Sequence, residues 1–250
     1  MICEEAYTIS YILDMNLSQD ITPDILLKLT RDTTEILNSK QSELSEVKWT
    51  DGESNTDTDF SILACKSCEE AFEKMKNDNI IDNKIKLICN IPDINCVFTK
   101  EEQVLEKKIE LKSCKGVKII GSTIRKLDIN QPLIYCLRSN TEPKFKLKYS
   151  QYHHALLPNE YASFQDRTPR PTLLFNNMKD PESEYKPFYE KEKGDWISEY
   201  AYSSINRLNN PKYDTWQEKL VSNIRTIVLN TFIKNTSIEE FIKLKEEIKG

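Results

Sequence analysis

The sequence predicts an α/β protein with a central mixed β-sheet of about five strands, flanked by helices and extended by helical segments at both ends. Three observations favour this class. Five short segments with alternating apolar residues follow one another between residues 84 and 150, an amphipathic helical pattern precedes them, and further helical patterns close the chain. Helices before and after a group of strands can cover the faces of one sheet.

The N-terminal part, residues 1–59, is predicted to contain one clear helix. The stretch "ITPDILLKLTRDTTEILNSK" offers Thr22 as N-cap and Pro23 at the first helical position, and its apolar residues recur at helical spacing. The segment that follows, "QSELSEVKWTDGESNTDTD" (41–59), is polar and rich in turn-forming residues. We therefore expect an exposed loop there.

A second helix and the strands make up the predicted core. The segment "FSILACKSCEEAFEKMKND" (60–78) suits a helix that turns Ala71, Phe72 and Met75 inward. The strands are predicted at 84–91, 93–98, 107–113, 131–139 and 144–150. The first three are separated by short connections, which favours an antiparallel meander.

The C-terminal part, residues 151–250, is predicted to be rich in loops and then helical. Pro, Asn, Tyr and charged residues are frequent from about 155 to 215, whereas "TWQEKLVSNIRTIVLNTFI" has one broad apolar face. Ser237 and Glu240 have the spacing of a capping box at the start of a last helix. Because no composition break separates these parts, we expect a single domain, 1–250, with its core at about 60–150.

Composition excludes several classes of protein. No apolar run approaches the length of a membrane span, and the start "MICEEAYTIS" is acidic where a secretory signal would be basic. A cytoplasmic protein with no membrane partner is expected. Only five glycines occur, and none has the spacing of a P-loop or a dinucleotide-binding turn. The nucleophile-elbow motif of serine hydrolases does not occur either.

The seven cysteines are interpreted as buried, reduced thiols, since most lie in apolar or strand-like sequence such as "KLICNI". Cys65 and Cys68 form a CxxC motif. A zinc site would need a second pair of Cys or His at suitable spacing, and His153 and His154 are adjacent in sequence. The sequence therefore favours buried thiols over zinc.

Charge is distributed unevenly along the chain, although the formal net charge is −5. Residues 1–60 contain 13 acids and four bases, whereas residues 107–148 contain 11 bases and only three acids. The local charge determines the electric field that a polyanion meets, so residues 107–148 are compatible with nucleic-acid binding. A solvated, lysine-rich surface is the plain alternative.

Two neighbouring predicted strands carry the residues with the clearest chemistry. In "IPDINCVF" Asp93 lies on the polar face, and in "EKKIELKSCKG" Glu110 and Lys112 do, while Ile109 and Leu111 face the core. If the strands pair as a meander, the two carboxylates and the lysine converge. Converging carboxylates repel each other unless a cation lies between them, and Mg²⁺ binds such oxygens. The pattern therefore indicates metal-assisted phosphodiester hydrolysis.

Pro92-Asp93 and, after 16 intervening residues, Glu110-Leu111-Lys112 resemble the motif of the PD-(D/E)xK nuclease superfamily, in particular type II restriction endonucleases. The resemblance covers roughly residues 60–150 and implies a restriction-endonuclease-like core. It implies that Asp93, Glu110 and the Leu111 carbonyl bind Mg²⁺, and that Lys112 acts on the attacking water. It further implies double-stranded DNA as substrate and a homodimer. An additional acid from the preceding helix would be Glu70 or Glu73, and the candidate DNA contacts are Lys115, Lys118, Arg125 and Lys126.

Other functions stay open at this point. An exposed Glu–Lys pair on an ordinary strand would show the same residues without chemistry. A repair or recombination nuclease that recognises DNA structure, an inactive DNA-binding protein of the same fold, and a protein that docks an acidic protein partner are the alternatives. A histidine-metal nuclease at His153 and His154 lacks a second ligand motif.

Overall fold

The computed structural model describes residues 17–49, 58–122, 128–162 and 170–191, and positions 227, 237 and 240. The chain divides into two compact units, Met1–Lys193 and Gly194–Gly250. In the second unit the predicted capping box is confirmed, because the Ser237 amide donates to the Glu240 carboxylate at 3.0 Å and the Glu240 amide donates to Ser237 Oγ at 3.2 Å. The predicted single domain and its internal boundaries stay a prediction.

The helices of the first unit agree with the sequence in two cases and correct it in one. They are α1 (Leu17–Asp20), α2 (Pro23–Ser39), α3 (Gln41–Glu46), α4 (Thr58–Asn77), α5 (Tyr152–Ala155) and the 3-10 helix η2 (Phe175–Asn177). Thr22 caps α2 as predicted, since its hydroxyl accepts the Ile25 amide at 3.3 Å. The helix α3 lies in the predicted loop, because Leu44 is fully buried in the core and anchors that turn. None of the helices in the described ranges is long and apolar enough to cross a membrane.

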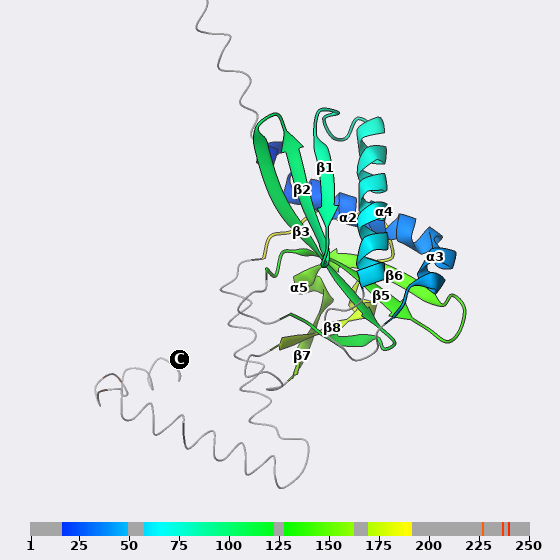
Figure 1. Cartoon of the computed structure of the whole chain (residues 1–250). Coiled ribbons are helices and arrows are strands. Elements are labelled where there is room, and N and C mark those ends of the chain that lie inside the picture. The colour runs from blue at the N-terminus through cyan, green and yellow to red at the C-terminus, as the bar shows by residue number, and fades with distance from the viewer. Residues whose placement is uncertain are drawn as a thin grey trace, which may run out of the picture. The chain divides into compact units, whose positions relative to one another are not determined.

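The predicted five-stranded mixed sheet is confirmed. Its strands are β1 (Lys86–Asn90), β2 (Ile94–Lys100), β3 (Gln103–Cys114), β5 (Pro132–Arg138) and β6 (Phe145–Gln151), in the spatial order β1-β2-β3-β5-β6. The meander of β1, β2 and β3 is antiparallel, β3 pairs with β5 in parallel, and β5 pairs with β6 antiparallel. Figure 1 shows β1, β2 and β3 side by side, with α4 running along β1.

One face of this sheet packs on α2 and α4, and that packing determines which side chains the other face presents. Ile94, Cys96 and Phe98 of β2 are fully buried in the cluster that includes both helices, as is Ile109 of β3. Each such side chain contributes about 1.5–3 kcal/mol through burial. Because side chains alternate along a strand, Lys108 and Glu110 point to the opposite face.

A second, three-stranded antiparallel sheet was not predicted. It consists of β4 (Lys118–Ile120), β8 (Arg170–Leu174) and β7 (Leu156–Ala162), in the order β4-β8-β7. Tyr135 of β5 joins the two sheets: its ring meets that of Phe175 edge-on at 5.3 Å, and its hydroxyl donates to the Gly116 carbonyl at 2.5 Å. The segments that flank β4 and β8 therefore pack on the face of β5 that α2 and α4 leave open.

Candidate active site

Strand β3 changes its partner in the middle, and this change creates the site. Its pairing with β2 ends at Ile94↔Ile109, and its pairing with β5, on the other edge, begins at Glu110↔Leu133. Beyond Ile109 the edge that β2 leaves exposes backbone groups that need a hydrogen-bond partner. Asp93 provides one, because its Oδ1 accepts the Leu111 amide at 3.0 Å. The carbonyl of a strand residue points to the same edge as its amide, so the Leu111 carbonyl faces this side too.

Asp93 is held in an uncommon backbone conformation directly before β2. Its φ is 58°, in the left-handed region that aspartate tolerates better than most residues. Such a conformation persists where surrounding contacts determine it. Here the side chain is held by Leu111, and the Asp93 carbonyl accepts a weak hydrogen bond from the Cys65 thiol at 3.8 Å. The backbone therefore aims the carboxylate at β3.

Glu110 is a buried acid with several polar partners. Its side chain is only 6% exposed. The Ser122 hydroxyl donates to Oε1 at 2.7 Å, and the Gln131 side-chain amide makes a longer contact with Oε2 at 3.5 Å. A buried carboxylate is costly unless hydrogen bonds and counter-charges satisfy it. The neutral partners supply part of that compensation, and two lysines supply the rest.

Asp93 and Glu110 converge on a single cation, the ammonium of Lys108. Its Nζ lies 2.8 Å from Asp93 Oδ2 and 2.9 Å from Glu110 Oε2. On the other side Lys112 Nζ lies 2.5 Å from Glu110 Oε1. The predicted convergence of Asp93, Glu110 and Lys112 is therefore present, with Lys108 between the two carboxylates.

The carboxylate pair has the properties that a hard divalent cation requires. Two oxygens, one from Asp93 before β2 and one from Glu110 of β3, already share one positive charge, and oxygen ligands are those that Mg²⁺ prefers. The side chain of Lys108 is 42% exposed, so its ammonium can move into solvent and leave the two oxygens to a metal. The residues present therefore fit a magnesium ion.

Glu110 is ionised at neutral pH. Burial alone would raise its pKa, but the Lys112 ammonium above all, together with that of Lys108, lowers the pKa from 4.5 to about 2. Burial likewise opposes the charge of Lys108, yet its hydrogen bonds to Asp93 and Glu110 raise the pKa of that lysine above its usual value. Both shifts favour the charged forms of Glu110 and Lys108.

This network makes stability sensitive to acid. A depressed pKa in the folded state stabilises the protein above the unfolded pKa, and that contribution is lost as the pH falls from about 4.5 to about 2. The loss for Glu110 is on the order of 3 kcal/mol. Urea unfolding across this pH window measures it. In a Glu110→Gln variant this part of the pH dependence should be missing, and an unchanged dependence would contradict the assignment.

Gly121 supports Glu110 through two intermediaries. The Tyr152 hydroxyl accepts the Ser122 amide at 2.6 Å, and the Ser122 hydroxyl in turn binds Glu110. A Cβ at position 121 would lie 2.1 Å from the Tyr152 hydroxyl oxygen and 3.0 Å from the Pro171 carbonyl oxygen. The absence of a side chain at Gly121 is what lets the tyrosine approach.

Gly121→Ala is accordingly expected to lower the free energy of unfolding by about 1–3 kcal/mol, because the fully buried Tyr152 ring cannot move aside without strain. Gly116→Ala is the matched control. Its Cβ would meet nothing closer than the Lys118 carbonyl oxygen at 3.7 Å, so little change is expected. Equal urea midpoints for the two variants would show that Tyr152 does not brace this site.

The other predicted site residues fall in different places. Glu70 pairs with Lys40 at 2.6 Å and Glu73 pairs with Lys76 at 3.1 Å. Both acids belong to α4, which packs on the face of β2 opposite to the Asp93 side chain. Among the described contacts, neither acid joins the pair formed by Asp93 and Glu110.

The predicted DNA contacts follow β3 in sequence. Lys115 lies directly after β3 and Lys118 begins β4, and both are exposed. Arg125 and Lys126 lie outside the described residues. Part of the positive charge of segment 107–148 is neutralised within the fold, because Asp180 pairs with Lys148 at 3.2 Å and with Lys146 at 3.4 Å.

Sequence reasoning missed three residues that bind Glu110. Strand alternation puts Lys108 on the same face as Glu110, but its role as the shared cation depends on the exact start of β2. Ser122 and Gln131 reach Glu110 only because β4 and β5 fold back beside β3. No local sequence signal marks either residue.

Comparison with known proteins yields no relative. No protein-family model, no curated protein and no solved structure matches this chain.

Proposed function

We propose that this protein is a Mg²⁺-dependent endonuclease of double-stranded DNA, acting as a type II restriction enzyme. The observation that carries the proposal is the convergence of Asp93 Oδ2 and Glu110 Oε2 on one ammonium, with Lys112 on the other oxygen of Glu110. Two acids with Lys112 beside them at one spot suit metal-assisted hydrolysis of a phosphodiester.

Each residue has a definite task in this mechanism. Asp93, Glu110 and the Leu111 carbonyl would hold the magnesium ion, which polarises a phosphoryl oxygen and lowers the pKa of a water. Lys112, fixed by Glu110, would orient or deprotonate the attacking water and stabilise the charge that develops on the phosphate. Ser122 and Gln131 would keep Glu110 in the orientation that its role requires.

Cleavage of phage DNA tests the proposal directly. The full chain is incubated with phage and plasmid DNA and Mg²⁺, with EDTA as control, and discrete bands are expected. A smear, or cleavage only at branched DNA, would indicate a nuclease that recognises structure. Salt-sensitive DNA binding without cleavage would indicate an inactive DNA-binding protein. Equal binding to unrelated polyanions would favour a protein partner instead.

Removing Lys108 should strengthen Mg²⁺ binding. In Lys108→Met the two carboxylates lose the ammonium with which the metal competes, so half-maximal cleavage should need about tenfold less Mg²⁺. The expected change is only tenfold because the side chain of Lys108 is partly exposed, and solvent weakens its ion pairs with the two carboxylates. Without Mg²⁺ the variant should melt at lower temperature than the wild type, and Mg²⁺ should restore much of the difference. An unchanged or higher Mg²⁺ requirement would show that Lys108 does not occupy the metal position.

A further inference from the structure

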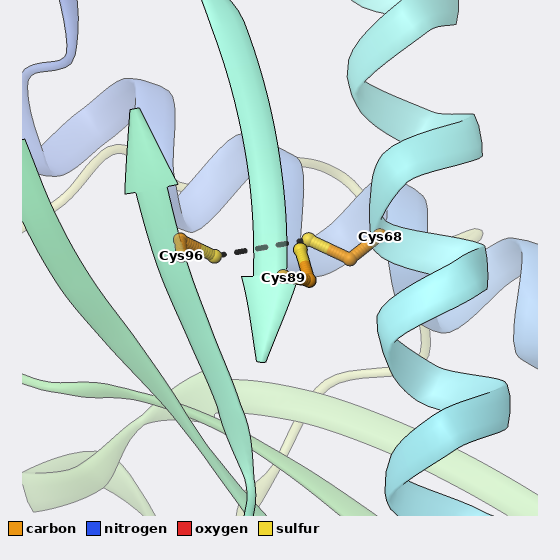
Figure 2. Close-up of side chains that lie close together, drawn as sticks. All are labelled: Cys68, Cys89 and Cys96. Carbon is orange, nitrogen blue, oxygen red and sulfur yellow. Dashed lines mark hydrogen bonds between the residues drawn. The ribbon is translucent and has the colours of Figure 1, made fainter. Parts of the chain in front are cut away.

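Four cysteines from two distant segments meet on the face of the β1–β2 hairpin that packs against α4. Cys65 and Cys68 lie one turn apart on α4, and Cys89 of β1 pairs directly with Cys96 of β2. Figure 2 shows Cys68 pointing from the helix toward Cys89 and Cys96. Cys65, Cys68 and Cys96 are buried and Cys89 is half-buried, and all four are free thiols. The CxxC motif thus has the second cysteine pair that the sequence did not reveal.

The sulfur atoms are spaced as ligands of one metal ion. Those of Cys68, Cys89 and Cys96 all lie within 4.8 Å of one another, and the Sγ atoms of Cys68 and Cys96 are 3.9 Å apart. Around a tetrahedral zinc ion with Zn–S bonds of about 2.3 Å, neighbouring sulfurs lie about 3.8 Å apart. The thiol of Cys65 interacts with that of Cys89 but lies outside this group of three, so it would have to move inward to serve as a fourth ligand.

The ligand set selects among metals. Sulfur ligands favour soft or borderline ions, and four cysteines around one centre are typical of structural zinc. An iron–sulfur cluster has inorganic sulfide and several irons between its cysteines, so it needs a wider separation than these sulfurs show. The Glu69 carboxylate accepts the Cys89 amide at 3.0 Å, which holds this part of β1 against the helix. The half-buried Cys89 gives the ion a path of entry.

We propose that Cys68, Cys89 and Cys96, with Cys65 as fourth ligand, bind one Zn²⁺ ion in a closed structural site. Each ligating thiol releases its proton to solvent when the metal binds. The ion would tie α4 to the β1–β2 hairpin, on the opposite face from the carboxylates. This zinc site is independent of the proposed nuclease activity and of the magnesium site.

Metal analysis of the full chain tests the zinc site without any DNA. The protein is purified under reducing conditions, and its metal content is measured by plasma mass spectrometry. About one Zn²⁺ per chain is expected. After the metal is removed with a chelator, titration with Co²⁺ should produce thiolate charge-transfer bands and the intense visible bands of tetrahedral cobalt, and Zn²⁺ should abolish them. Chelation should also lower the melting temperature, and Zn²⁺ should restore it.

Two matched variants locate the ion. Cys89→Ser changes the least buried thiol of the cluster. Loss of a residue that only supports a ligand typically weakens metal binding by roughly 10- to 100-fold, so loss of this ligand should weaken Zn²⁺ binding by more than that. Cys136→Ser changes a buried strand thiol outside the cluster and should keep the metal. The proposal is overturned if the reduced wild type takes up neither Zn²⁺ nor Co²⁺, if it contains iron with inorganic sulfide, or if it contains a Cys68–Cys96 disulfide and no metal. Equal zinc content in the Cys89→Ser variant and the wild type would overturn it as well.

Discussion

Replacing Glu110 by glutamine is expected to reduce Mg²⁺-dependent DNA cleavage by roughly 10³-fold, because a bound metal stabilises the transition state by several kcal/mol and each 1.4 kcal/mol is about tenfold in rate. Glutamine keeps the size of the side chain and can still accept the Ser122 hydroxyl. It removes the negative charge that Lys108 and Lys112 share and that the metal needs. Single-turnover cleavage of a DNA fragment with a mapped site measures the loss.

Glu106→Gln is the matched control for this variant. Glu106 lies on the same strand and the same face, four residues before Glu110, and it is exposed. Its replacement should leave cleavage unchanged. Both variants should bind DNA, so a gel-shift experiment separates lost chemistry from lost binding. If Glu110→Gln cleaves as fast as Glu106→Gln, the metal assignment is wrong.

The central sheet was predictable because its signals are local. Alternation places Ile94, Cys96 and Phe98 on one face, and the short connection to β3 permits only an antiparallel neighbour. Once the hairpin register is correct, Asp93 and Glu110 must lie on the same side. A shift of one residue would have separated them, so the prediction of the site depended entirely on that register.

The rest of the site depends on contacts that no local pattern encodes. Strands β4 and β8 lie about 50 residues apart in sequence and pair only in the folded chain, and this pairing places Ser122 beside Glu110. The cysteines show the same limit. Six residues separate Cys89 from Cys96, a spacing that matches no familiar metal motif, but the two are equidistant from the turn of their hairpin. Symmetric placement around a turn was the signal that could have revealed the pair.

Replacing Lys112 by methionine is expected to reduce cleavage by about 10²–10⁴-fold, the range typical of a lost proton-transfer group. Methionine preserves most of the apolar stem, which matters because the side chain of Lys112 is only 20% exposed. Mg²⁺ should still bind, since Asp93, Glu110 and the Leu111 carbonyl remain. Calorimetric titration with Mg²⁺, beside the cleavage assay, distinguishes this result from that of the Glu110→Gln variant.

The matched control is Lys144→Met, which makes the same change at an exposed lysine of the basic segment, just before β6. A uniform loss of surface charge would weaken DNA binding similarly in both variants and leave their maximal rates alone. If Lys112 takes part in the reaction, the maximal rates should differ instead: at saturating DNA, Lys112→Met should cleave slowly and Lys144→Met should cleave at the wild-type rate. Equal maximal rates would reduce Lys112 to a counter-ion of Glu110, and the Glu–Lys pair on β3 would then be structural.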